Sequence, residues 1–395
     1  MDLWLQTALT QAAWQGVRVI MSYQALAVTG SAVFVGLQSG AFALAGLLIA
    51  LPTGRLADRF GCAIVCSLGL LIATTGTVAA LFFPVSIGLL IAALLLGAGH
   101  VGLVVGQQSF AAKLATGGNT DTAFGTLTAA ASIGQLIGPP VVATVAAMAT
   151  ADIANPNTAL GLMICLGFLI LAMPSTIRLS GQERLLQSTR KQATRGNPPI
   201  PLQSVLRVPG MWQSLVVSGI VFVSVDLLSS FLPVWAQERG VPATIVGLLL
   251  ATRAVVTISS RIGMPWLLDR LKRKFILIAA IGLAVFALSA LPLVNQWWAF
   301  PLMCLIGIGL GLPQPLTMTW VVSLAPRSSR GAALGLRMTC NRLVQVSLPL
   351  AVSTIAVPIG IGAVFWSAAA CLAFAAAISV GAHMPAVQDD ADDPG

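Results

Sequence analysis

Long apolar runs, separated by short polar intervals, follow one another along the chain. Twelve such runs lie at residues 4–27, 33–54, 62–83, 86–110, 122–148, 157–178, 211–235, 243–266, 275–294, 297–323, 331–355 and 359–382. A helix rises ~1.5 Å per residue, so about 20 apolar residues cross a hydrocarbon layer of ~30 Å, whereas barrel strands would alternate between apolar and polar positions. The pattern therefore predicts an all-α membrane protein with twelve transmembrane helices.

Composition excludes a soluble protein. Hydrophobic residues make up 57% of the 395 positions and charged residues only 8%, against about 25% charged in soluble domains. The longest polar interval, residues 180–209, is rich in Gln, Ser, Arg and Pro and indicates a flexible linker. We therefore expect a six-helix bundle at 1–179, a cytoplasmic linker at 180–209, a second six-helix bundle at 210–384 and an acidic cytoplasmic tail at 385–395.

Lysine and arginine residues outside the runs gather on one side of the predicted membrane. With the N-terminus in the cytoplasm, fifteen lie on the cytoplasmic side, counting Arg178 at the end of its run, and Arg239 alone lies outside. Because positively charged loops stay inside, both termini are predicted to be cytoplasmic. The net charge of +9 is then a topology signal, and such scattered basic residues predict no nucleic-acid partner. Tryptophans near the run ends are expected to be interfacial anchors: Trp4, Trp212, Trp235, Trp297 and Trp298.

The two halves of the chain repeat one another. Short patterns recur 210 or 211 residues apart: Asp58-Arg59 with Asp269-Arg270, VGL at 35–37 with 246–248, Gly97 and Gly99 with Gly307 and Gly309, and the frame at 123–139 with that at 333–349. Two six-span halves in parallel orientation are a known plan of secondary transporters, with the substrate site between them near the membrane midplane. We therefore expect two six-helix parallel repeats around a central cavity.

The segment GRLADRFG at 54–61, between the second and third runs, resembles the corresponding loop of the major facilitator superfamily. The family's loop continues with basic residues where this chain has Cys62 and Ala63, and the second copy has Pro265 in place of the glycine. Span count, linker and repeat extend the resemblance over the whole chain. The alternative is that these arginines only set the topology, which leaves the repeated aspartate unexplained. The resemblance implies a gate that holds the cytoplasmic side shut in the outward-facing state, formed by Gly54, Asp58, Arg59, Asp269 and Arg270.

The fifth run resembles the glycine and proline pattern of drug:proton antiporters, the twelve-span type within this family. Its matching residues are Gly125, Gly134, Gly138 and Pro139, whereas Val142 and Ala143 stand where that pattern ends in two glycines. The arginine that these antiporters usually carry in span four is absent, with Ala93 near its place. The resemblance implies export, and the alternative is that small residues and a proline serve only close helix packing and bending.

Ionisable and amide side chains within the runs are candidates for a substrate or coupling cavity, because each costs at least a few kcal/mol in lipid without a partner or a cavity. The candidates are Gln15, Arg18, His100, Asp226, Arg253, Arg337, Asn341 and Arg342. They fall on polar stripes of their helices, which should face inward. The surplus of arginine over acid predicts an anionic or zwitterionic substrate. The alternative is that Asp226 neutralises one arginine and the others only hold helices together.

Two of these residues are rival candidates for carrying a coupling proton. His100 is the only histidine within the runs, because the other one, His383, follows the end of the last run. Imidazole titrates near neutral pH. Asp226 is its rival, and a neutral histidine bonded to a neighbour is the alternative role for His100. The six cysteines are scattered and no hydrolase or metalloprotease motif occurs, so we expect no cofactor, no metal and no enzyme activity.

Together these features predict a proton-linked secondary transporter that works by alternating access. We expect a monomer in the inner (plasma) membrane of a bacterium, with a small-molecule substrate, protons and the lipid bilayer as its partners. The predicted activity is export of a small organic compound or drug of anionic or zwitterionic character. Proton-coupled uptake of an organic anion such as a carboxylate is the alternative.

Overall fold

The computed structural model describes residues 1–114, 120–150, 152, 154–189, 208–324, 330–382 and 384. All regular secondary structure within these ranges is helical. The greater part of the predicted linker, residues 190–207, and the acidic tail at 385–395 lie outside the described residues.

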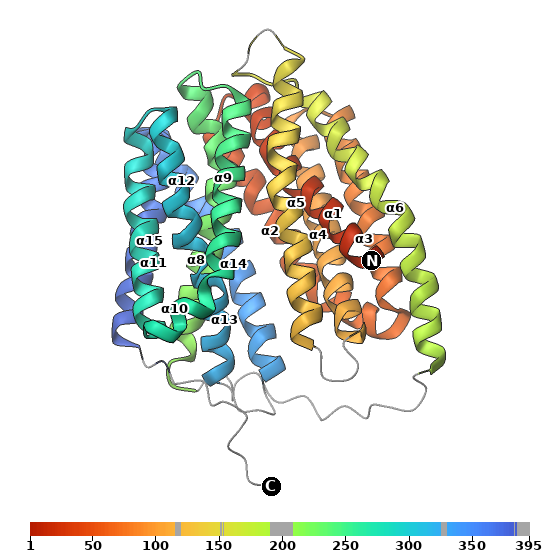
Figure 1. The fold of residues 1–395 in the computed structure, drawn as a ribbon. Coiled ribbons are helices and arrows are strands. Elements are labelled where there is room, and N and C mark those ends of the chain that lie inside the picture. The colour runs from red at the N-terminus through yellow and green to blue at the C-terminus, as the bar shows by residue number, and fades with distance from the viewer. Residues whose placement is uncertain are drawn as a thin grey trace.

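The helices form two bundles that lie side by side (Figure 1). The first contains α1 (Asp2–Thr29), α2 (Ala32–Phe60), α3 (Cys62–Phe82), α4 (Ser86–Leu114), α5 (Thr120–Met148) and α6 (Thr158–Thr189). The second contains α8 (Met211–Glu238), α9 (Ala243–Ile262), α10 (Met264–Arg270), α11 (Arg273–Ala290), α12 (Gln296–Gly311), α13 (Pro313–Leu324), α14 (Arg330–Ile359) and α15 (Gly362–Gly381), with a short 3-10 helix at Leu291–Leu293. At the contact between the bundles, α2 packs against α14 and α5 packs against α9.

The internal repeat found in the sequence recurs in the helix boundaries. α2 begins at Ala32 and α9 at Ala243, 211 residues later, while α4 and α12 begin 210 residues apart, at Ser86 and Gln296. These separations equal those of the repeated sequence patterns. The predicted all-α fold of two six-span repeats is therefore confirmed.

Several predicted runs have different limits in the structure, α2 for example continuing to Phe60, and proline accounts for two of three further differences. The run at 243–266 ends at Ile262 and a separate helix follows, because Pro265 lacks an N–H and its ring would clash with the carbonyl group of Arg261. Pro313 breaks the run at 297–323 between α12 and α13 in the same way. The third, α6, continues to Thr189, so residues 180–189 are helical and not the start of a flexible linker.

Ten helices of the described part of the chain are long and apolar enough to cross a membrane. α1 is not among them, because glutamines, threonines and Arg18 interrupt its apolar face. These polar side chains are buried inside the protein, among them Gln6, Thr10 and Arg18. A helix with buried polar groups and neighbours on several sides does not need a uniformly apolar surface.

The two ends of the bundles differ in how the halves meet. We call the end with the Gly61 turn and α10 the gate end, at the bottom of Figure 1, and the end with the turns at Gly30 and Gly240 the far end. Towards the far end, Tyr23 and Ala147 of the first bundle belong to one buried apolar cluster with the core of the second bundle. The two bundles are therefore in apolar contact toward the far end.

One predicted interfacial anchor is wrong. Trp235 is fully buried in this far-end cluster, and the guanidinium of Arg239 lies 5.1 Å from its ring centroid. Trp235 serves the contact between helices because α8 passes through the centre of the second bundle, where a large aromatic ring gains more by packing than at a headgroup region. Trp297 and Trp298, by contrast, are 65% and 66% exposed, as lipid-facing anchors should be.

Gly134 and Gly138 allow α5 to lie directly against α1. A Cβ atom added at Gly134 would fall 2.2 Å from the carbonyl oxygen of Ala8, and one at Gly138 would fall 2.3 Å from that of Ala12. Both contacts are with backbone atoms, which cannot rotate away. Gly125 lies in the part of α5 whose side-chain packing the structure does not describe, so its role in packing stays a prediction.

Replacing Gly134 with alanine should therefore lower the free energy of unfolding by about 1–3 kcal/mol, the usual cost of overpacking. Thermal unfolding of the purified protein, followed by gel filtration, would measure the effect. Gly167→Ala is the matched control, because no atom lies within 4 Å of its added Cβ and alanine favours helix. Equal melting temperatures for the two variants would contradict the close contact.

Candidate functional site

An ion pair joins the two bundles at their centre. Arg18 on α1 and Asp226 on α8 contact through Nη1 and Oδ1. The other terminal nitrogen of Arg18 donates to the carbonyl oxygen of Asp226 at 3.2 Å and to the hydroxyl of Ser230 at 3.1 Å. The Arg18 side chain is 5% exposed and that of Asp226 is 18% exposed, so the pair is largely shielded from solvent.

A second arginine reaches the same carboxylate through an amide. Gln345 on α14 donates from Nε2 to Oδ2 of Asp226 and accepts a hydrogen bond of 2.9 Å from Nη1 of Arg342. Arg342 also extends toward the first bundle, where its Cδ would lie 3.8 Å from a Cβ added at Gly46 of α2. We call Arg18, Asp226, Gln345 and Arg342 the central network. It links α1, α8 and α14 through a single carboxylate.

Arg253 on α9 lies near the central network and carries further positive charge. Its side chain is 6% exposed, and its Nε atom is buried without a hydrogen-bond partner. Asn341 on α14 is also buried, and its Oδ1 atom has no partner. Both atoms therefore have hydrogen-bonding capacity that the described protein groups leave unused.

Arg337 and Gln15 do not belong to the central network. Arg337, lower on α14, donates from Nη2 to the carbonyl oxygen of Gln314 at 3.4 Å. Gln15 is half-buried on α1, and no hydrogen bond among the described residues joins it to Asp226 or its partners. The structure thus gathers three of the predicted arginines with Asp226 and places the fourth closer to the gate end.

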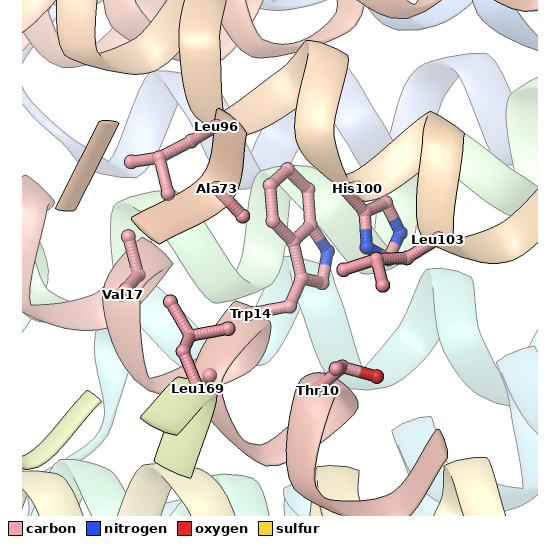
Figure 2. Close-up of a pocket in the computed structure, with 9 residues that line it drawn as sticks. Thr10, Trp14, Val17, Ala73, Leu96, His100, Leu103 and Leu169 are labelled. Atoms are coloured by element: carbon pink, nitrogen blue, oxygen red, sulfur yellow. The ribbon is translucent and has the colours of Figure 1, made fainter. Parts of the chain in front are cut away.

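His100 lies inside the first bundle, against an aromatic neighbour that also contacts Arg18. Its imidazole stacks on the Trp14 indole with ring centroids 4.0 Å apart and an angle of 4° between the planes. The guanidinium carbon of Arg18 lies 5.8 Å from the Trp14 ring centroid. Figure 2 shows both rings beside a small, mostly apolar cavity that Thr10 also lines. Trp14 therefore connects the environment of His100 to the central network.

The predicted gate residues lie toward the gate end of the two bundles. Arg59, Asp269 and Arg270 are exposed. The two guanidiniums instead lie over aromatic rings of their own helices, Arg59 at 5.1 Å from the Phe60 centroid and Arg270 at 4.2 Å from that of Trp266. A Cβ at Gly54 would have no neighbour within 4 Å, and the side chain of Asp58 is outside the described residues. The halves are in contact at the far end and the centre, and no ion pair joins the described side chains of Arg59, Asp269 and Arg270 across the gate end.

Glu183 is a buried group that the sequence analysis missed. Its carboxylate accepts hydrogen bonds from the backbone N–H groups of Cys62 at 2.8 Å and Ala63 at 2.7 Å, the first residues of α3. A carboxylate at a helix N-terminus satisfies free N–H groups and offsets the positive end of the helix dipole. Glu183 lies within the helical extension of α6, and its negative charge in an otherwise basic stretch was the only signal in the sequence.

Replacing Glu183 with alanine should leave these two N–H groups without partners and cost about 1–3 kcal/mol for each. A marked loss of thermal stability is therefore expected. Glu183→Gln, which keeps an acceptor oxygen but not the charge, should lose less. Melting curves of both variants at the same pH would test the order, and an unchanged Glu183→Ala would contradict it.

A sequence model of the Major Facilitator Superfamily matches residues 3–349. The chain belongs to this family. It is a membrane transporter with several transmembrane helices, and the resemblance seen in the loop at 54–61 is confirmed at the level of the superfamily. No curated protein sequence matches the chain.

Solved transporter structures share the fold at low sequence identity. The nucleoside transporter NupG is 13% identical, with a TM-score of 0.77, and the match covers 96% of this chain and 97% of that one. The peptide transporter POT in complex with sulfate is 14% identical, with a TM-score of 0.75 and coverage of 96% and 93%. A bacterial homologue of the iron transporter ferroportin in the inward-facing state is 16% identical, with a TM-score of 0.70 and coverage of 96% and 97%. Such different transporters establish the fold and leave the substrate open.

Proposed function

We propose that this family member is a proton-linked transporter that exports a small organic anion or zwitterion across a bacterial inner membrane. The observation that carries the proposal is the ion pair of Arg18 with Asp226, since its two partners lie in different bundles. A proton on Asp226 removes the charge that holds Arg18, so protonation loosens the contact between the halves. The gate end then corresponds to the cytoplasmic side, in keeping with the distribution of lysine and arginine.

The charge balance at the centre supports an anionic substrate. Asp226 is shared by Arg18 and, through Gln345, by Arg342, while Arg253 adds a third buried guanidinium nearby. Buried charges are stable when they are paired, so an incoming carboxylate or similar group supplies the missing negative charge. Such an anion and the carboxylate of Asp226 compete for the same arginines. Anion binding and the charge state of Asp226 are therefore linked through these arginines.

Export is favoured by the fifth span. Gly134 and Gly138 bring α5 against α1, and Pro139 and Pro140 of α5 lie against Gly247 of α9 in the other bundle. The two prolines of this span thus lie at the contact between the halves, whereas Gly134 and Gly138 pack the span within the first bundle. Proton-coupled uptake of an organic anion uses the same central residues and is separated from export only by the direction of flux.

Proteoliposomes of known orientation provide the test. With an imposed pH gradient and a dye that reports internal pH, addition of a panel of organic acids should produce proton movement opposite to that of the transported acid. A thermal-shift screen of the purified protein against organic acids, chelators and common drugs would select the panel. Proton and acid movement in the same direction would establish uptake instead, and the absence of any proton movement with a transported acid would refute the coupling.

A further inference from the structure

We propose that the second bundle carries a second anion site, nearer the gate end than the central network. Arg261 of α9, Arg337 of α14 and Gln314 of α13 form it, and the ligand is a carboxylate, sulfate or phosphate group. The inference deepens the proposed function and rests on it in one respect, namely that the site serves as a first docking position for the anionic substrate.

The site is built on the break between α12 and α13. Pro315 has no N–H, so the carbonyl group of Gly311 lacks its usual partner four residues later in the helix. Nε of Arg261 donates to that carbonyl oxygen at 3.2 Å, and Nη2 of Arg261 donates to Oε1 of Gln314. The helix break therefore holds the guanidinium of Arg261 in one orientation.

A second guanidinium approaches the same residue from another helix. Nη2 of Arg337 donates to the backbone carbonyl oxygen of Gln314 at 3.4 Å, a long hydrogen bond, and its Nε atom is buried without a partner. Each guanidinium has five N–H donors, so most of those of Arg337 are not used by these contacts. Two arginines from different helices thus meet at one glutamine.

No described carboxylate neutralises this pair. The ion pairs found in the described part of the chain are those of Arg18 with Asp226 and of Arg178 with Asp2. Carbonyl and amide oxygens satisfy hydrogen bonds but leave two half-buried guanidiniums without a counter-charge. A bound anion supplies that charge and accepts charge-assisted hydrogen bonds from the guanidinium N–H groups. A purely structural role as a cap for the broken helix accounts for Arg261, but it does not account for Arg337.

The same two helices, α9 and α14, carry arginines at the centre and at the second anion site. Arg261 follows Arg253 by eight residues on α9, about 12 Å along the helix, and Arg337 precedes Arg342 by five residues on α14, about 7.5 Å. The two sites therefore succeed one another from the gate end toward the centre. An anion that enters from the gate end meets Arg261 and Arg337 first and passes to Arg253 and Arg342.

Equilibrium binding of radiolabelled sulfate tests the site in the full-length protein in nanodiscs of neutral lipid at constant ionic strength. The wild-type protein should bind two sulfate ions, and Arg261→Gln with Arg337→Gln should bind one. Lys272→Gln is the matched control, since it removes an exposed cation at the same end and should keep both sites. Arg337→Gln alone leaves the cap of Gly311 in place and should weaken one site about tenfold, which separates loss of binding from misfolding.

Two sites in the variant that lacks both arginines would overturn the proposal. Repeating the measurement with phosphatidylglycerol in the nanodiscs distinguishes the ligand's source. If the lipid displaces sulfate from this site alone, the site binds a lipid headgroup and its role in docking substrate is wrong. Loss of one sulfate site in a protein that shows no proton-driven transport would sustain the anion site while refuting the proposed function.

Discussion

Asp226→Asn should abolish transport driven by a pH gradient. The amide cannot take up or release a proton, so the contact between α1 and α8 can no longer respond to pH. It also leaves Arg18 buried without a counter-charge, and removing one partner of a buried ion pair typically costs about 3–5 kcal/mol. We therefore expect two effects, namely loss of proton movement in proteoliposomes and a lower melting temperature.

The double variant Arg18→Gln with Asp226→Asn separates these effects. Both charges are gone, so most of the lost stability should return, because a neutral pair of hydrogen-bonding side chains replaces an unpaired cation. Proton coupling should remain absent. If Asp226→Asn transports with an unchanged dependence on the pH gradient, Asp226 is not the proton carrier.

In that case His100 becomes the leading candidate, and His100→Gln distinguishes the two. This variant keeps a polar side chain beside Trp14 but cannot titrate.

Arg253→Gln and Arg342→Gln should each abolish binding of the transported anion while the protein stays folded. Loss of a buried, charge-assisted contact with a ligand costs at least about 2 kcal/mol, which corresponds to an affinity about 30-fold weaker. Arg342 has a neutral partner in Gln345, and Nε of Arg253 has none, so neither substitution strands a buried carboxylate. A thermal-shift titration with the organic acid that the wild-type protein transports would measure the loss.

Arg178→Gln is the control for this pair of variants. Its side chain is 72% exposed and pairs with Asp2 near the gate end, so its removal should leave the affinity unchanged. Unaltered binding and transport by both Arg253→Gln and Arg342→Gln would show that these arginines serve helix packing alone.

Much of this protein could be predicted from its sequence because hydropathy is a local property. Runs of apolar residues predicted the spans, and short motifs 210 or 211 residues apart predicted the repeat that the helix boundaries confirm. The same local signals failed where proline breaks a helix within an apolar run, at Pro265 and Pro313, because a hydropathy pattern does not register a missing N–H.

The sequence also selected most of the charged residues at the centre, since an arginine within an apolar run stands out wherever the chain folds. It could not assign their partners. The contact of Arg18 with Asp226 joins residues 208 positions apart, and the one between Cys62 and Glu183 joins residues 121 apart. Such pairs depend on which faces of two helices meet.

The sequence by itself determined the class of protein, the two parallel repeats and the excess of buried positive charge. Only the tertiary structure decided which arginines share Asp226, which pair meets at Gln314 and where the two bundles make apolar contact. The physical reason is that a helix fixes neighbours three or four residues apart, whereas contacts between helices are set by packing over the whole bundle.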